Sequence, residues 1–230
     1  MKLEKTTEKF SALNKRWYDD ACGTALALEL VGERWSLLIL REMMFGGRRF
    51  SELRAGMPGI SANVLTERLE SLEGVGIVQR RKLPPPASVQ IYELTPWGYE
   101  AEVILQQLGR WATRSPLHDP TLPLSAASIM MSFRTMFSTV HAAGEVARIA
   151  FKFGEETFMI DIDADGLRSR RAQPVESAPC VTTNPMSLAS VVYGGRPLAD
   201  AEDKGELSIV GDRDVLKRFM TWFPLPAKLT

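Results

Sequence analysis

Residues 50–94 read FSELRAGMPGISANVLTERLESLEGVGIVQRRKLPPPASVQIYEL, which predicts two short helices followed by a two-stranded ribbon. The first helix ends at residues 56–59, because Gly and Pro there favour a turn. Ser61 is a suitable N-cap for the second helix, since its hydroxyl can accept a hydrogen bond from a free amide of the first turn. Leucines recur at helical spacing and form the inward face of that helix, namely Leu65, Leu69 and Leu72.

Two predicted strands follow the second helix and form a hairpin. They cover residues 77–83 and 89–94, and the Pro-rich residues 84–88 form a rigid tip between them. The ascending strand carries three cations whose long side chains can reach phosphate or the minor groove, namely Arg80, Arg81 and Lys82. Helix, turn, helix and ribbon in this order predict a winged helix.

The exposed side of the second helix is the candidate surface for base contacts. With the leucines inward, about 100° per residue places Asn63 and Thr66 on the opposite side. In helix-turn-helix proteins the N-terminal part of the second helix enters the major groove. Glu67 points to the same side, so it must meet a cytosine amino group or lie aside. The predicted groove and phosphate contacts are Ser61, Asn63, Thr66 and Arg68, with Arg48 and Arg49 on flanking phosphate.

Short motifs stand in a fixed order over residues 20–114, and together they are more specific than any one alone. They are Cys22-Gly23, Gly32-Glu33-Arg34-Trp35, Leu37-Leu38-Ile39-Leu40-Arg41-Glu42, Gly47-Arg48-Arg49-Phe50-Ser51-Glu52-Leu53, Pro58-Gly59-Ile60-Ser61, Val64-Leu65-Thr66-Glu67-Arg68-Leu69, Leu72-Glu73 and Tyr92-Glu93-Leu94-Thr95. This region resembles the HxlR family of bacterial winged helix-turn-helix transcription regulators. The resemblance implies a homodimeric regulator that binds double-stranded DNA.

Length and composition describe an ordinary globular protein. The 230 residues are 45% hydrophobic and 24% charged, and no apolar run approaches the length that crosses a bilayer. Residues 1–8 lack the apolar core of a signal peptide, so we expect a cytoplasmic protein without a membrane partner. Lys and Arg number 16 against 14 Asp and Glu before Ser115, and 12 against 14 from it onward. With zero net charge, DNA binding should rely on operator contacts more than on bulk attraction.

Three helical segments are predicted before residue 50. Residues 22–31 and 34–45 are predicted helices, and the inward side of the second consists of Trp35, Leu38, Ile39 and Met43. Residues 3–18 are a predicted helical arm whose narrow apolar stripe consists of Phe10, Leu13 and Trp17. This arm would pack on its own domain or cross to a partner subunit.

The helix that Thr95 caps and Pro96 begins has the widest apolar stripe. We expect two subunits to share this stripe, with packing on the chain's own second domain as the alternative. It consists of Trp97, Ala101, Ile104, Leu105, Leu108, Trp111 and Ala112.

The chain is predicted to hold two domains and to be α+β overall. Residues 1–114 are the winged helix DNA-binding and dimerisation domain, residues 115–124 are a Pro-rich linker, and residues 125–230 are a second domain of mixed helices and strands. The predicted elements of that domain are a helix from Ser125 to about His141, strands over 146–153 and 158–163, a hairpin at Asp165-Gly166 into 167–171, a helix from Pro185, a strand over 207–210 and a final helix capped by Asp212.

This order of elements, with residues 181–188 and 205–212 as the most telling motifs, resembles the sterol carrier protein domain. The resemblance implies a cavity for a small apolar ligand, lined by Phe133, Phe137, Phe158, Ile160, Val192, Phe219 and Trp222. The alternative is that these side chains fill a dry core, because apolar residues at such spacings occur in any packed domain.

Motifs for metal or catalytic chemistry are incomplete. Residues 161–166 begin like a calcium loop, but the twelfth position is Ala172 instead of Glu. His118 and His141 lack Cys or His neighbours at zinc spacing, and the chain has no glycine-rich phosphate loop or Gly-x-Ser-x-Gly elbow. We therefore expect no metal, no cofactor and no enzymatic activity.

Cys22 and Cys180 are too few to predict a disulfide framework. Cys22 precedes a helix N-terminus, where the helix dipole lowers a thiol pKa. The HxlR resemblance implies that a thiol near this place can sense oxidants, and an inert thiol is the alternative.

The sequence thus predicts a homodimeric DNA-binding transcriptional regulator that a small apolar ligand in the C-terminal domain controls. The alternative function is a lipid or small-molecule carrier in which the winged helix domain serves mainly for assembly. An enzyme acting in the C-terminal cavity would need an activated nucleophile or a perturbed carboxylate, and the sequence locates neither.

Overall fold

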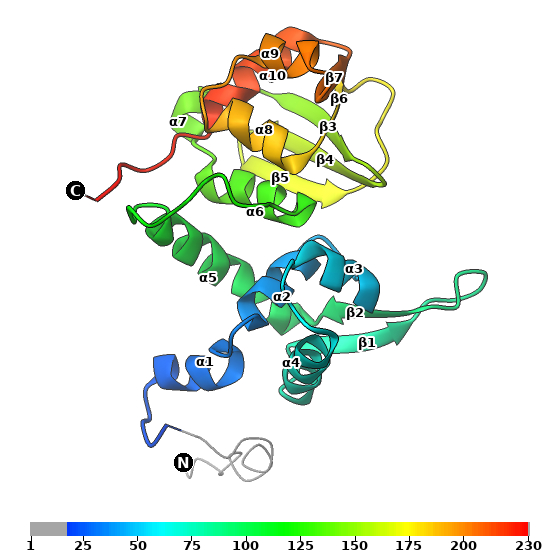
Figure 1. The fold of residues 1–230 in the computed structure, drawn as a ribbon, viewed down its shortest axis with the longest axis vertical. Coiled ribbons are helices and arrows are strands. Elements are labelled where there is room, and N and C mark those ends of the chain that lie inside the picture. Colours follow the sequence, from blue (N-terminus) through cyan, green and yellow to red (C-terminus); the bar gives the residue numbers. More distant parts are fainter. Residues whose placement is uncertain (1–17, 230) are drawn as a thin grey trace. The chain divides into compact units, whose positions relative to one another are not determined.

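The computed structural model describes residues 18–229, which separate into two compact units, one ending at Glu102 and the other beginning at Val103 (Figure 1). The predicted arm of residues 3–18 therefore lies outside the described residues, apart from Tyr18. The division falls inside a helix, and the assignment of residues 115–124 as the linker stays a prediction. No helix within the described range is both long and apolar enough to cross a membrane.

The first unit is a set of helices with one hairpin. Its elements are α1 (Gly23–Val31), α2 (Ser36–Met43), α3 (Phe50–Gly56), α4 (Ala62–Gly74), β1 (Val78–Lys82), β2 (Gln90–Leu94) and the first turns of α5 (Pro96–Ala112). The side chains that pack these elements together are almost completely buried, among them Ile39, Met43, Leu53, Leu65, Leu69 and Leu72. The predicted order of helix, turn, helix and hairpin is confirmed.

Helix α2 begins later than the sequence predicts. Its predicted start is residue 34, but Trp35 has a φ of 82°, a left-handed conformation that a residue with a bulky side chain rarely adopts, so the helix begins at Ser36. Of the four side chains predicted to face inward, Ile39 and Met43 do so, whereas Leu38 is 38% exposed and Trp35 is partly exposed.

Thr95 and Gly98 fix the start of α5 to the residues just before β1. Thr95 caps the helix as predicted, because its Oγ1 accepts a hydrogen bond from the Gly98 amide at 3.1 Å. The same hydroxyl donates to the carbonyl of Gly76 at 2.8 Å. A Cβ at Gly98 would lie 2.3 Å from the carbonyl oxygen of Ile77, so only glycine permits this close approach.

The second unit consists of a five-stranded sheet and helices. After the rest of α5 it contains α6 (Ala126–Met136), α7 (Thr139–Ala142), β3 (Ala147–Phe153), β4 (Glu156–Asp163), β5 (Gly166–Arg171), β6 (Cys180–Thr183), α8 (Pro185–Val192), α9 (Leu198–Asp203), β7 (Leu207–Val210), α10 (Arg213–Phe219) and the 3₁₀ helix η2 (Met220–Trp222). The strand order is β5-β4-β3-β6-β7. Strands β3 and β6 are parallel, and the other neighbours are antiparallel.

A cluster of aromatic rings holds α6 and α10 against the sheet. Phe133 of α6 lies edge-to-face on Phe219 of α10, with ring centroids 5.2 Å apart. Both rings pack on Phe151 of β3, at 5.9 and 5.3 Å. Burial of such rings is a large share of the stability of a domain this size.

Three elements of the second unit differ from the prediction. The single helix expected to run to about His141 is two helices, because Phe137 is extended, with a ψ of 132°, and Ser138 then caps α7. The sequence does not predict strand β6 or helix α9. They have four and six residues, so the periodic signal is weak, although β7 also has four residues and lies where the sequence predicts it.

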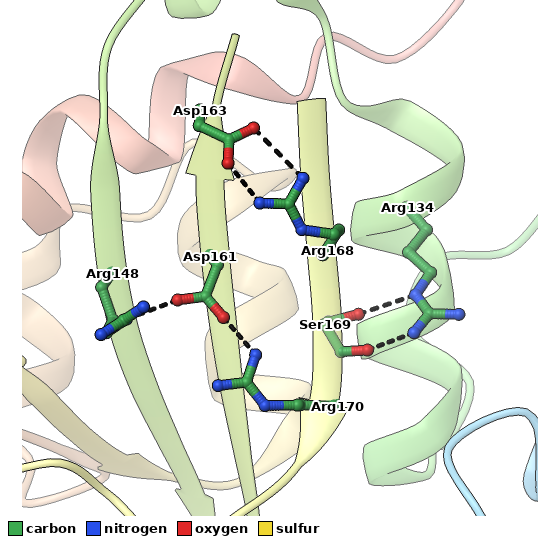
Figure 2. A network of polar contacts seen from close by, with 7 residues as sticks. All are labelled: Arg134, Arg148, Asp161, Asp163, Arg168, Ser169 and Arg170. Carbon is green, nitrogen blue, oxygen red and sulfur yellow. Dashed lines mark hydrogen bonds and ion pairs between the residues drawn. The ribbon is translucent and has the colours of Figure 1, made fainter. Parts of the chain in front are cut away.

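Pairs of opposite charges connect β3, β4 and β5 (Figure 2). Asp161 of β4 accepts hydrogen bonds from Arg148 of β3, at 2.5 Å, and from Arg170 of β5. Arg168 donates to both carboxylate oxygens of Asp163. Figure 2 also shows Arg134 of α6 donating to the Ser169 hydroxyl at 2.9 Å, which ties that helix to the edge strand.

The acidic run at residues 161–166 is a hairpin bordered by arginines. Gly166 has a φ of 116°, which permits the tight turn between β4 and β5. Among residues 18–229, no group of three or more His, Cys, Asp or Glu side chains is placed to hold a metal ion.

Candidate nucleic-acid interface

The N-terminal half of α4 presents a polar, exposed side. Ser61 caps the helix, and its hydroxyl accepts a hydrogen bond from the Val64 amide at 3.2 Å. Asn63 and Thr66 are both exposed, whereas Leu65 is fully buried, so the helix has the orientation that the sequence predicts. Capping occupies one lone pair of the Ser61 hydroxyl, and its proton can still be donated to DNA.

Arg68 is turned toward acidic neighbours instead of projecting freely. Its side chain is 16% exposed, and its guanidinium lies 3.5 Å from Glu33 and 3.3 Å from Glu67. Glu67 therefore has a partner on its own helix and lies to that side. The contact with Glu33 also connects α4 to the turn between α1 and α2.

The two arginines before α3 have different environments. The backbone of Arg48 pairs with that of Tyr92 in both directions, at 2.7 and 2.8 Å, and its side chain is only 9% exposed. Arg49 is exposed and its amide donates to Glu52 at 2.8 Å. Arg49 is therefore placed for a phosphate contact at the surface, whereas the Arg48 side chain is mostly buried. Phosphate binding by the pair stays a prediction.

Both wing arginines are bonded to carboxylates. The guanidinium of Arg80, on β1, donates to Glu73 at the end of α4, with an Nε–Oε2 distance of 2.6 Å, and lies 5.9 Å from the centre of the Tyr92 ring. Arg81 donates two hydrogen bonds of 2.9 Å to Glu93 on β2. Arg80, Arg81 and Lys82 are all exposed, so the wing offers cations to solvent along one strand.

The pKa of Glu93 lies below its ordinary value. The main cause is the hydrogen bond from Arg81, which outweighs the opposing effect of burial, and Gln79 adds a further hydrogen bond at 2.9 Å. Glu93 is thus a charged carboxylate at neutral pH. The pairing register places Gln79 opposite Glu93 across the hairpin.

Three carboxylates that pair with these arginines, Glu33, Glu73 and Glu93, are not among the site residues predicted from sequence. For Glu93 the available signal is the hairpin register, which brings its side chain to the face that carries Gln79 and Arg81. For Glu33 and Glu73 the contact depends on tertiary packing, and the sequence carries no signal for it.

Cys22 is exposed at the start of α1. Its thiol pKa is lowered, first by a hydrogen bond from the backbone amide of Thr24, then by the Thr24 hydroxyl and the amide of Ala25. Cys180 is partly buried on β6.

The second half of α5 exposes apolar side chains. Ile104, Leu108 and Trp111 are 49%, 42% and 72% exposed. With Val103 and Gln107 they line an open groove of about 490 Å³. Large exposed apolar patches mark interaction surfaces, so this stripe is the candidate interface of the second half of α5.

Most of the residues predicted to line a ligand cavity are buried, and ring contacts join Phe133, Phe219 and Trp222. Phe133, Phe158, Ile160, Phe219 and Trp222 are buried, and Phe137 and Val192 are partly exposed. Ring distances of 4.6 to 6.0 Å connect Phe133, Phe137 and Phe219 to Phe223. Such packing is what a filled core requires, and a ligand cavity here stays a prediction.

Residues 30–118 match the family model described as HxlR-like helix-turn-helix. The chain is 39% identical over 88 residues to "Uncharacterized HTH-type transcriptional regulator YvaP" of Bacillus subtilis, and the match covers 38% of this chain and 81% of that protein. It is 40% identical over 86 residues to "HTH-type transcriptional regulator YodB" of the same organism, covering 37% and 77%.

A solved structure, "Reduced form of the transcriptional regulator YodB from B. subtilis", is 36% identical with a TM-score of 0.38, covering 41% of this chain and 94% of that one. The family match lies in the first unit and its immediate continuation. The resemblance of the C-terminal residues to a sterol carrier protein domain therefore remains a prediction. On the match of residues 30–118 and of relatives that align over most of their length, the chain belongs to the HxlR-like helix-turn-helix family.

Proposed function

We propose that this protein is a transcriptional regulator that binds duplex DNA as a homodimer. The observation that carries the proposal is the combination, in one unit, of an exposed polar start of α4 and a wing with three exposed cations, in a chain whose relatives are named as helix-turn-helix regulators. Asn63 and Thr66 would contact base edges in the major groove. The wing cations would contact phosphate, which adds affinity without reading sequence.

A homodimer is supported by α5. Its exposed stripe of Ile104, Leu108 and Trp111 is apolar enough to lie in an interface. Two copies related by a twofold axis would present two copies of α4, the recognition helix. This arrangement fits two DNA half-sites about one helical turn apart.

Control by a small apolar molecule in the second unit is the finer part of the proposal. It rests on the sterol carrier resemblance of residues 125–230 alone. Because Phe133 and Phe219 already contact each other and Phe223, a ligand would have to displace side chains from this cluster. A copurified apolar molecule detected by native mass spectrometry would support it, and its absence together with enrichment of a genomic fragment would favour a regulator with a filled core over a carrier.

Redox control at Cys22 is a second candidate for regulation. The exposure of the thiol and its lowered pKa favour it, since the thiolate is the form that reacts with oxidants.

The wing is tested by replacing both Arg80 and Arg81 with Ala and measuring DNA binding over a range of salt concentrations. The expected result is weaker binding and a flatter dependence of log K on log salt concentration, by about 0.9 for each phosphate that the variant no longer neutralises. The matched control is R213A/R218A on α10, because those arginines are also paired with glutamates and their removal changes net charge equally. A wild-type slope in R80A/R81A would contradict the assigned wing.

A further inference from the structure

The wing arginines are satisfied inside the protein before any DNA arrives. Arg80 and Glu73 form an ion pair with a 2.5 Å separation, and Arg81 and Glu93 form a two-bonded pair at 2.9 Å. Each arginine comes from β1, and the two carboxylates come from α4 and β2. The pairs therefore join the wing to both elements that flank it.

These ion pairs are accessible to a competing anion. The side chains of Arg80 and Arg81 are 42% and 51% exposed, so water and salt reach both guanidinium groups. Exposed pairs of this kind contribute little to stability. A DNA phosphate offers the same bidentate acceptor geometry as a carboxylate, so it can replace the carboxylate on an arginine.

We infer that Glu73 and Glu93 compete with DNA phosphate for Arg80 and Arg81, and so limit the affinity of the wing for any duplex. In this arrangement binding exchanges two internal ion pairs for phosphate contacts. The net gain per arginine is smaller than for a free cation. With a net charge of zero, the chain then depends on a correctly seated recognition helix for stable binding.

The inference rests on the proposed function, since it concerns the same wing. The alternative role for the carboxylates is to position the arginines for DNA, in which case removing their charge would weaken binding. Glu→Gln separates the two roles, because glutamine keeps the shape and one acceptor oxygen but loses the charge.

The experiment measures binding of E73Q and E93Q to a random-sequence duplex and to a genomic fragment that the wild-type protein enriches. We expect both duplexes to bind about two- to fivefold more tightly to each variant, as the removal of an exposed ion pair allows. D163N is the matched control, because Asp163 is also held by an arginine, Arg168, but lies on the hairpin of the second unit. Its affinity should equal that of wild type.

A double-mutant cycle shows whether the effect passes through the arginine. E93Q should tighten binding in the wild-type background and have no effect in R81A, and E73Q should behave in the same way with R80A. An equal gain in the arginine-free backgrounds would mean that the carboxylate acts on DNA directly, and it would overturn the inference.

Weaker or unchanged binding of E73Q and E93Q would overturn the inference too, as would equal tightening by D163N. The Arg80–Glu73 and Arg81–Glu93 pairs share no residue, so measurements on E73Q alone decide the question if E93Q does not fold. Failure of the wild-type protein to bind either duplex would instead refute the proposed function, and this outcome is distinct from all the others.

Discussion

Several arginine side chains of this protein pair with a carboxylate of a neighbouring residue or element. A carboxylate lies within bonding or ion-pair distance of each of Arg68, Arg80, Arg81, Arg148 and Arg170. The residue types can be read in the sequence, but their partners come mostly from neighbouring strands and helices. These five cations look available in the sequence but are engaged in the fold.

Asp161 is a nearly buried carboxylate that two of these arginines hold. Burial raises its pKa, but the hydrogen bonds from Arg148 and Arg170 outweigh burial and hold the pKa below its ordinary value. Asp161→Asn leaves both arginines without this charged partner. We expect it to lower the free energy of unfolding of the second unit by about 1–2 kcal/mol, since the arginines are half-exposed and solvent compensates part of the effect.

The pH dependence of that effect follows from the lowered pKa. The contribution of Asp161 is fully present above its ordinary pKa of 3.8 and disappears as pH falls through the lower value in the folded protein. Urea unfolding at neutral pH should thus separate wild type from D161N, and the two should converge as pH falls below 3.8. A difference that persists unchanged in acid would contradict the ion-pair account.

The thiol of Cys22 should ionise more easily than an ordinary cysteine. Its pKa is lowered from 9.0 by hydrogen bonds from the Thr24 amide and hydroxyl and from the Ala25 amide. Alkylation of Cys22, followed by mass spectrometry across pH, should therefore reach half its maximum rate below pH 9.0. Cys22→Ser should abolish this reaction, and Cys180→Ser should keep it. A midpoint at or above 9.0 would remove the basis for redox control.

At the scale of elements, periodicity and capping predict the first unit well. The helix opened by Ser61, the hairpin of β1 and β2 and the cap at Thr95 are where the sequence places them. These signals are local. A capping side chain bonds to the first turn of its own helix, and side chains alternate between the two faces along a single strand. The predicted start of α2 is wrong because Trp35 adopts a left-handed conformation that no propensity indicates.

Helix α5 gives the element-scale prediction. Leu108→Glu and Trp111→Glu place charges in the exposed apolar stripe, so we expect either to shift a dimer toward monomer and weaken association at least about tenfold. Sedimentation velocity over a range of protein concentrations measures this. Leu117→Glu is the control, because Leu117 is 90% exposed beyond the end of α5. A wild-type monomer, or dimers unaffected by both changes, would refute dimerisation through α5.

At the scale of the whole molecule, the two units differ in how far sequence reasoning extends. The first unit can be assigned to a family because its motifs stand in a fixed order, and the family match covers residues 30–118. In the second unit the sequence predicts the main strands and helices but not β6, which pairs in parallel with β3 across a long connection. Parallel pairing is non-local, and short segments carry little pattern.

A ligand cavity in the second unit is also a property that the sequence pattern does not determine. Apolar spacing identifies Phe133, Phe158 and Phe219 as inward-facing, and they are buried. Spacing alone does not distinguish the lining of a cavity from a packed core, since both require buried apolar side chains. The ring contacts of Phe133 with Phe219 and Phe223 are tertiary facts that only the structure supplies.

The most direct test of a DNA-binding regulator is a hydroxyl-radical footprint of full-length protein on the genomic fragment it enriches most. We predict two protected segments about one helical turn apart, with weaker protection by R80A/R81A at the same protein concentration and full protection by R213A/R218A. A wild-type protein that enriches no fragment, or a footprint that R80A/R81A leaves unchanged, would contradict the claim that α4 and its wing bind the grooves of duplex DNA.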